Sequence, residues 1–235
     1  MVDFRLLVFF ALIAGANSAR AEILPSAIEP PTAPCNYFTA DAEYVNFFLE
    51  MRLEEKTIPM SVPKIFLEDK FDQQNGAKHA AQLFRVTVDS FEPVTRRETS
   101  KLNRQGIHNW MTFIVSDRIE MIDLASVALS SAEWGLPKEP FISYQLVPSD
   151  FGLLRALPKG NEPVETVYFF LEAGGNPETI ISCDIQESFL YHNCTQQFRT
   201  LNMDVSVDYR IEQFPNWRSI QSKIDSFLGC AVTPN

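Results

Sequence analysis

The sequence lacks the patterns on which most recognised enzyme chemistry depends. Only nine glycines and three histidines occur in 235 residues. The motifs G-x-G-x-x-G, G-x-x-x-x-G-K, G-x-S-x-G and H-E-x-x-H are all missing, which argues against a dinucleotide fold, a phosphate loop, an esterase elbow and a zinc protease. A serine triad stays open, because its members need not be neighbours in sequence. We therefore expect no cofactor and no bound metal, and we assign no catalytic residue.

Long hydrophobic runs are also missing, apart from one at the N-terminus. Leu6–Ala16 is uncharged, follows Arg5 and precedes the A-x-A cleavage site Ala19-Arg20-Ala21. A membrane-spanning helix needs about 20 apolar residues, so this shorter run predicts a secretory signal peptide over residues 1–21, cleaved before Glu22. A buried N-terminal helix is the alternative. We expect an exported chain, periplasmic or secreted, with no membrane insertion after signal cleavage.

Positive charge is in deficit, since 20 Lys and Arg stand against 30 Asp and Glu and the formal net charge is −10. Nucleic acid backbones and anionic lipid surfaces repel such a chain. We expect no nucleic acid partner, and for a protein partner the charge favours a basic surface. The one basic stretch, residues 96–104, is interpreted as a solvated loop or helix face, with an anion site as the alternative.

Four cysteines occur: Cys35, Cys183, Cys194 and Cys230. An even number in an exported chain indicates disulfides, and four cysteines allow three pairings. We favour Cys183–Cys194, which closes a short loop, and Cys35–Cys230, which ties the two ends of the domain together. A metal site near His192 and Cys194 is the alternative, but C-x-x-C is absent and the spacing matches no structural zinc pattern.

The first third of the chain is interpreted from its prolines and its apolar spacing. Residues 22–38 are rich in proline and indicate an extended lead-in. Over 39–56, the apolar residues Val45, Phe48 and Leu49 have helical spacing, which predicts a helix. A single α+β domain is expected over 39–235.

Stretches of β-branched and aromatic residues predict a series of strands. They cover residues 82–91, 110–116, 141–147, 151–157, 165–171, 179–185, 194–200 and 203–209. The last stretch alternates strictly between apolar and polar residues, which is typical of a half-buried antiparallel strand.

A helix is predicted near the C-terminus. Four apolar residues share one face at helical spacing: Trp217, Ile220, Ile224 and Phe227. Pro215 suits its first turn and Gly229 its end, and we expect the apolar face to pack on the sheet, which gives these four residues a structural role. The order of elements predicts an α+β fold, a mainly antiparallel sheet with an N-terminal helix and a C-terminal helix packed on it.

Few side chains invite a chemical interpretation. The sequence contains three histidines: His79, His108 and His192. Nothing near them in sequence supplies a nucleophile with an orienting partner, so an ordinary hydrogen-bonded or surface role is favoured over catalysis. Glu68, Asp69 and Asp72 form an acidic run. A calcium ion is one interpretation, but the spacing is not that of an EF-hand, and a solvated turn is favoured.

Three patches of the sequence resemble a group of bacterial proteins. They are residues 84–95, the pair Ser182-Cys183 and Asn193-Cys194-Thr195, and residues 205–209 followed by 214–220. In order and spacing they are similar to uncharacterised exported proteins and lipoproteins of Gram-negative bacteria, over the C-terminal two-thirds of the chain. The resemblance implies an envelope location but no activity and no site residue. The lipidation cysteine of the lipoprotein members is missing here.

Three functions remain open from the sequence. The first is an exported, non-enzymatic protein-binding domain, in one version an immunity or inhibitor protein for a toxin delivered into the envelope. Export, acidity and the missing catalytic motifs favour it. The second is a hydrolase with a dispersed active site, which requires a histidine beside a nucleophile or carboxylate in a cleft. The third is a structural envelope component, assembled through an exposed strand edge. Whether the chain is an enzyme stays undecided, with the non-enzyme favoured.

Overall fold

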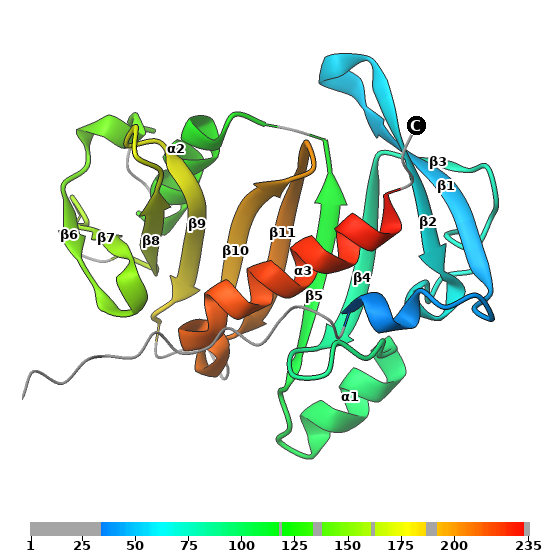
Figure 1. Cartoon of the computed structure of the whole chain (residues 1–235). Coiled ribbons are helices and arrows are strands. Elements are labelled where there is room, and N and C mark those ends of the chain that lie inside the picture. Colours follow the sequence, from blue (N-terminus) through cyan, green and yellow to red (C-terminus); the bar gives the residue numbers. More distant parts are fainter. Residues whose placement is uncertain (1–33, 118, 134–137, 161–162, 187–191, 233–235) are drawn as a thin grey trace, which may run out of the picture. The chain divides into compact units, whose positions relative to one another are not determined.

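The structure is a computed structural model that describes residues 34–232, except 118, 134–137, 161–162 and 187–191. The predicted signal peptide and residues 22–33 of the lead-in lie outside the described residues. The described strands form an eight-stranded sheet in the order β4-β5-β11-β10-β9-β8-β7-β6 and a three-stranded sheet in the order β2-β1-β3 (Figure 1). All pairs in the larger sheet are antiparallel, which confirms the predicted α+β class.

The bounds of the elements are as follows. The strands are β1 (Tyr44–Met51), β2 (Lys56–Pro63), β3 (Lys78–His79), β4 (Ala81–Thr87), β5 (Trp110–Ser116), β6 (Leu146–Pro148), β7 (Leu154–Ala156), β8 (Glu165–Leu171), β9 (Pro177–Asp184), β10 (Asn193–Thr200) and β11 (Met203–Arg210). The α-helices are α1 (Arg96–Arg104), α2 (Met121–Ala132) and α3 (Trp217–Ala231). The 3-10 helices are η1 (Pro34–Tyr37), η2 (Arg52–Glu54), η3 (Lys64–Phe66), η4 (Phe141–Ser143), η5 (Asp150–Gly152) and η6 (Ile211–Asn216).

The predicted N-terminal helix over 39–56 is wrong, because this stretch forms β1, η2 and the start of β2. Its apolar residues satisfy two periods at once: Val45, Phe47 and Leu49 also alternate with a period of two, and all three are buried. Pairing decides between the periods. β2 pairs with β1 residue by residue, from Tyr44 opposite Pro63 to Met51 opposite Lys56, and this partner is invisible to a local pattern.

Other predicted elements need smaller corrections. Of the stretch 141–147, the first residues form η4 and only the last two join β6. Of 151–157, only Leu154–Ala156 is a strand, since η5 precedes it. The C-terminal helix runs past Gly229 to Ala231, where the Val232 N–H still bonds to the Leu228 carbonyl. The end of the lead-in is the turn η1 rather than extended chain.

The main core lies between α3 and one face of the larger sheet, and β1 and β2 close its side. Phe227 of α3 sits at its centre, with ring centroids 4.8 Å from Phe66, 5.2 Å from Phe84 and 5.3 Å from Phe91. The four residues of the predicted apolar face, Trp217, Ile220, Ile224 and Phe227, are all buried in this core. The C-terminal helix therefore packs on the sheet through that face.

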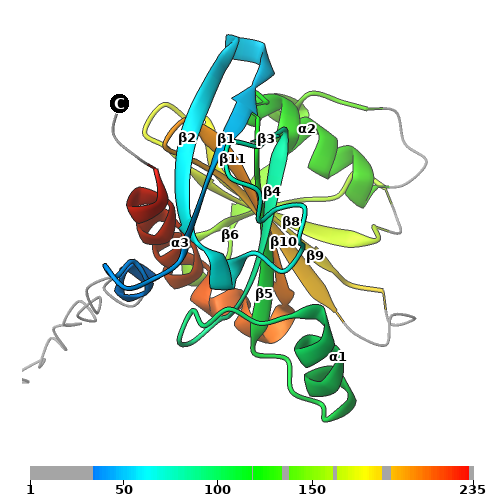
Figure 2. The same ribbon diagram turned by 90° about the vertical axis from the view of Figure 1, so that its right-hand side faces the viewer.

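A second, smaller core lies between α2 and β8 and β9. Ala125 and Leu129 of α2 pack there with Phe169 and Ile180. Because neighbouring residues of a strand point to opposite faces, Ile180 contacts the α2 side and Ile181 the α3 side. Figure 2 shows the two helices on opposite sides of the sheet. No helix in the described part of the chain has the length and apolar content needed to cross a bilayer.

Candidate interaction surface

The tip of the β1–β2 hairpin exposes an apolar side chain at one end of the larger sheet. Leu53 in η2 is 74% exposed. Its backbone N–H donates to the Asp117 Oδ2 atom at 3.1 Å, just after β5 ends. The hairpin tip is therefore attached to the end of the larger sheet, and its leucine faces solvent.

The segment that follows β5 is held in place by a buried carboxylate. Asp204, at the start of β11, accepts a hydrogen bond from the Ile119 N–H at 2.6 Å and pairs with the Arg199 Nε atom at 2.9 Å. The Arg199 guanidinium also donates to the Ile119 carbonyl. These contacts fix the backbone of Ile119, whose side chain nevertheless stays 52% exposed.

The turn between β10 and β11 presents a third apolar side chain, in a strained backbone. Thr200 pairs with Met203, so the loop has two residues, Leu201 at φ 49° and Asn202 at φ 63°. Positive φ at both positions is the geometry of a type I′ hairpin turn, which favours Asn or Gly at both. A leucine there costs about 1–2 kcal/mol, and its side chain is 45% exposed. Strain of this kind is concentrated at functional sites.

Helix α2 contributes a fourth segment. Its inner face is buried, but Ile122 in its first turn and Val127 in its second stay about half exposed. We call the combined patch the apical surface. It consists of Leu53, Ile119, Ile122 and Leu201, and Figure 1 shows the hairpin tip, the end of β5 and the β10–β11 turn together at the top of the picture.

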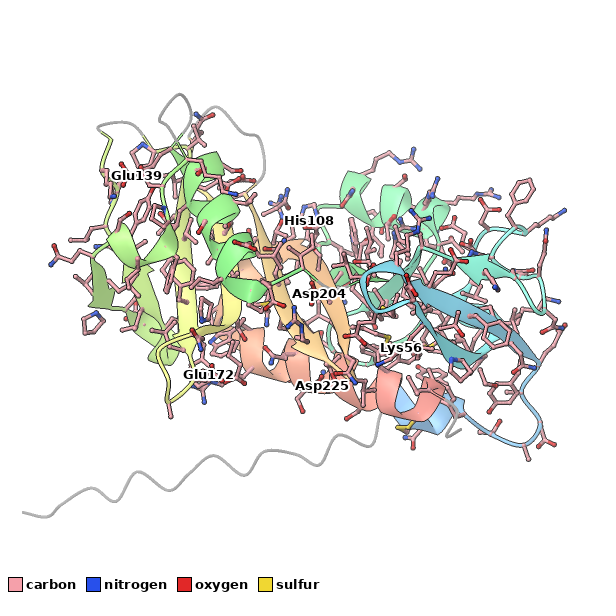
Figure 3. All side chains as sticks on the ribbon, turned by 90° about the horizontal axis from the view of Figure 1, so that it is seen from above. Lys56, His108, Glu139, Glu172, Asp204 and Asp225 are labelled. Atoms are coloured by element: carbon pink, nitrogen blue, oxygen red, sulfur yellow. A yellow bond between two sulfur atoms is a disulfide. The ribbon has the colours of Figure 1, made fainter. Side chains whose placement is uncertain are left out.

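Carboxylates surround these apolar side chains. Glu55, Glu120 and Asp123 are exposed, and the described residues form no ion pair with any of the three. The Lys56 Nζ atom forms an ion pair with the Glu54 Oε2 atom at 3.3 Å. Figure 3 looks down onto this end of the molecule, where Asp204 and Lys56 are labelled.

An apolar centre with an acidic border has the chemistry of a protein-binding surface. Binding energy concentrates in a few apolar anchors, and charges around them steer a partner of opposite sign. Because hydrogen bonds already fix the backbones of Leu53 and Ile119, little order has to be gained on binding.

The histidines do not assemble a catalytic group in the described part of the chain. The His79 ring packs edge-on against Phe47, with centroids 5.3 Å apart. The His108 Nδ1 atom lies 3.0 Å from the Asn103 Oδ1 atom. The His192 carbonyl accepts a hydrogen bond from the Ile211 N–H at 3.1 Å.

One serine does lie beside a potential base. The Lys159 ammonium donates to the Ser143 Oγ atom at 2.8 Å, and Ser–Lys pairs act as nucleophile and base in some hydrolases. Here the ammonium also forms an ion pair with Glu139, and a hydrogen bond from Lys159 lowers the pKa of that carboxyl. Because the Lys159 ammonium is already engaged by the Glu139 carboxylate, this contact does not favour the hydrolase.

The acidic run of the sequence is used structurally. Glu68 Oε2 pairs with Arg85 at 2.7 Å, and its Oε1 atom accepts the Arg96 N–H at 2.9 Å. Asp69 accepts the Phe71 N–H at 2.9 Å. No group of three or more His, Cys, Asp or Glu side chains in the described residues has the geometry to hold a metal ion.

The four cysteines form two disulfides. Cys183 and Cys194 face each other on β9 and β10, with Cα atoms 4.1 Å apart, and both are buried. Cys35 of η1 is bonded to Cys230 near the end of α3, with a Cα separation of 5.9 Å. This is the pairing that the sequence favours. The disulfides stabilise the scaffold and lie outside the apical surface.

A groove of about 740 Å³ runs beside η1 and η3 and is the main alternative surface. Its apolar wall includes Tyr37, which packs edge-on against Phe66 at 5.2 Å. Its charges are largely paired with each other, Lys64 with Glu43 at 2.6 Å and Glu68 with Arg85 at 2.7 Å. The groove therefore offers fewer free charges to a partner than the apical surface does.

Sequence reasoning missed every apolar residue of the apical surface. Leu53 and Ile119 stand alone among charged neighbours, and α2 was not predicted at all. The one local signal is Leu201-Asn202 between two predicted strands, because a two-residue turn with a leucine in it breaks the usual turn chemistry.

No family model matches the chain, and no curated protein matches it in sequence. The fold is similar to that of Smlt3025, an immunity protein of the Stenotrophomonas maltophilia type IV secretion system. The TM-score is 0.56 at 11% identity, covering 81% of this chain and 95% of that one. The iron-regulated outer membrane lipoprotein FrpD of Neisseria meningitidis is also similar, with a TM-score of 0.48 at 12% identity, covering 81% of this chain and 92% of that one.

Proposed function

We propose that this chain is an exported, non-enzymatic protein that binds another protein through the apical surface. The observation that carries the proposal is the presence of exposed Leu53, Ile119, Ile122 and Leu201 at one end of the sheet, with the backbones of Leu53 and Ile119 held by specific hydrogen bonds. Apolar side chains gathered on one exposed face are typical of interaction sites, where a few apolar anchors supply most of the binding energy.

Its partner is a protein with a basic border around an apolar pocket. The carboxylates Glu55, Glu120 and Asp123, which form no ion pair with the residues that the structure describes, favour that sign of charge and would speed association. The overall charge of −10 acts in the same direction.

The specific role is that of an immunity protein, which neutralises a toxin delivered into the bacterial envelope. The fold likeness to an immunity protein of a type IV secretion system supports this version. So do the two disulfides, which are typical of chains that work in an oxidising compartment such as the periplasm.

The test uses the exported toxins encoded beside the gene for this chain as probes. Each is titrated into the mature protein by calorimetry, and each is produced in the periplasm of cells with and without the chain. We expect one of them to form a complex of defined stoichiometry and to stop killing cells that carry the chain.

Charge reversal locates the contact. Glu120→Lys combined with Asp123→Lys should weaken the complex by at least about tenfold, since like charges then face each other. Glu178→Lys is the matched control, because Glu178 is an exposed carboxylate of β9 beside α3, and it should leave affinity unchanged. Failure of every neighbouring toxin to bind, or equal affinity for both variants, would contradict the proposal.

A further inference from the structure

A cavity of about 340 Å³ lies between α2, β7 and β8, away from the apical surface. Its apolar wall is formed by Leu129, Ala132, Ala156, Val167 and Ile185. Small-molecule sites typically have a volume of about 300–1,000 Å³ and combine such a wall with a few polar groups. The cavity therefore has room for a compact ligand.

One polar group of the cavity is a buried carboxylate with a structural task. Glu133 is 4% exposed. Its Oε2 atom accepts the Tyr144 hydroxyl at 3.3 Å, and its Oε1 atom accepts the backbone N–H groups of Lys159 and Gly160. Burial, followed by the nearby Glu133 charge, raises the pKa of Tyr144 to about 12. The Tyr144 hydroxyl therefore stays protonated at neutral pH and can donate a hydrogen bond.

The second carboxylate of the cavity has no such task. Glu165, at the start of β8, is half-buried, and within the described residues no hydrogen bond or ion pair reaches its carboxylate. Asp184 lies directly opposite it on β9. Burial and the Asp184 charge raise the pKa of Glu165. A half-buried carboxylate beside another one is destabilised unless a cation joins it.

The neighbouring cations do not supply that charge. Arg155 lines the cavity, but it pairs with Tyr168 in the sheet register, so its side chain leaves the sheet on the face opposite Val167. The Lys159 ammonium forms an ion pair with Glu139, which is labelled in Figure 3. The same ammonium lies 4.3 Å from the centroid of the Tyr144 ring. Neither cation forms an ion pair with Glu165.

We propose that this cavity binds a small primary amine with a compact apolar body, whose ammonium group pairs with Glu165 while the body fills the space beside Leu129 and Val167. The ammonium donates to the Glu165 carboxylate and lies close to Asp184, which removes the repulsion between the two acids. The apolar body replaces water along the inner wall. This site is separate from the apical surface and does not depend on the proposed immunity role.

The experiment compares three probes of one shape: cyclohexylmethylamine, cyclohexylmethanol and cyclohexanecarboxylate. Binding to the full chain is measured by calorimetry and by ligand-observed NMR at neutral pH. The amine should bind at least about tenfold tighter than the alcohol, the range expected for a hydrogen bond to a charged group. The carboxylate should not bind.

Two variants assign the site. Glu165→Gln keeps the shape of the side chain and should remove the preference for the amine over the alcohol. Ala156→Leu fills the cavity and should abolish binding of both. Glu178→Gln, the change of an exposed carboxylate elsewhere on the sheet, is the matched control and should change nothing.

Three outcomes would overturn the proposal: equal affinity for amine and alcohol, no effect of Glu165→Gln, or no binding of the amine at millimolar concentration. Circular dichroism shows whether each variant is folded. If Glu165→Gln does not fold, Asp184→Asn replaces it, because the amide oxygen can still accept the Asn193 N–H that Asp184 accepts at 3.1 Å. That variant should weaken binding of the amine and leave the affinity for the alcohol unchanged.

Discussion

The Tyr209 hydroxyl donates a hydrogen bond to the Gln196 Oε1 atom at 3.0 Å, beneath α3 and out of contact with water. The Gln196 amide in turn donates to the Gln221 Oε1 atom at 3.1 Å, which also accepts from Thr179. Burial raises the pKa of Tyr209, so its hydroxyl stays a donor. A polar network thus connects β9, β10 and β11 to the C-terminal helix inside an otherwise apolar core.

Removal of one member of this network should be costly. Tyr209→Phe leaves the Gln196 oxygen buried without its donor, and we expect a loss of about 1–3 kcal/mol in the free energy of unfolding. Urea unfolding measures it. Tyr44→Phe, which removes an exposed hydroxyl bonded to the Thr39 carbonyl, is the control and should change stability by less than about 0.5 kcal/mol. Equal effects would show that the buried network adds nothing.

Trp217 should be among the most important residues for stability. It is 3% exposed, and its Nε1 atom donates to the Phe151 carbonyl at 3.2 Å. Trp217→Ala should destabilise the protein by about 3–5 kcal/mol, since it opens a cavity between helix and sheet. Thermal and urea unfolding test this, with exposed Val127→Ala as the control. A melting temperature close to that of the wild type would contradict the packing of α3 on the sheet.

The two disulfides should differ in their accessibility to reductant. Cys183 and Cys194 are buried, whereas Cys230 is exposed. Dithiothreitol at low concentration should therefore break Cys35–Cys230 first, as shown by alkylation and peptide mass. On the chain-entropy model, loss of this long loop destabilises by about 5 kcal/mol and loss of the short one by about 3 kcal/mol. Earlier labelling of Cys183 would reverse the expected order.

Replacement of Leu201 by glycine should raise the stability of the protein and lower its affinity for the proposed partner. Leu201→Gly relieves the positive φ of the turn and should raise the free energy of unfolding by up to about 1 kcal/mol. The same change removes an apolar anchor of the apical surface and should weaken the proposed complex. Asn202→Gly changes the other turn residue without removing an apolar group and serves as the control. A stabilised Leu201→Gly variant with unchanged affinity would exclude this turn from the interface.

Glu165 should make stability depend on pH in a particular direction. Its folded pKa is raised, so the folded state binds its proton more readily than the unfolded state does. The carboxylate therefore destabilises the fold at neutral pH, and this effect disappears as the pH falls through the raised pKa. Glu165→Gln should raise the free energy of unfolding by up to about 1 kcal/mol at pH 7, and it should have no effect near pH 4. The gain at pH 7 is small because the side chain is only half-buried. Urea unfolding at both pH values measures this, and a constant difference would contradict it.

Several elements could be predicted because their information is local. The strand Met203–Arg210 alternates strictly in sequence and buries one face, and the apolar positions of α3 form one stripe. The even cysteine count and the loop lengths favoured the pairing that the structure contains. In each case one segment carries a complete pattern that needs no distant partner to be recognised.

Tertiary structure decided the rest, because the deciding partners lie far apart in the chain. The residues around Phe47 fit a helix or a strand until β2 pairs with them. The apical surface exists only because Asp117 and Asp204 bring segments from across the sequence to one end of the sheet. Sequence alone thus determined the composition, the charge and the strongly patterned elements, while long-range pairing determined which apolar residues stay exposed together and which acids share a cavity.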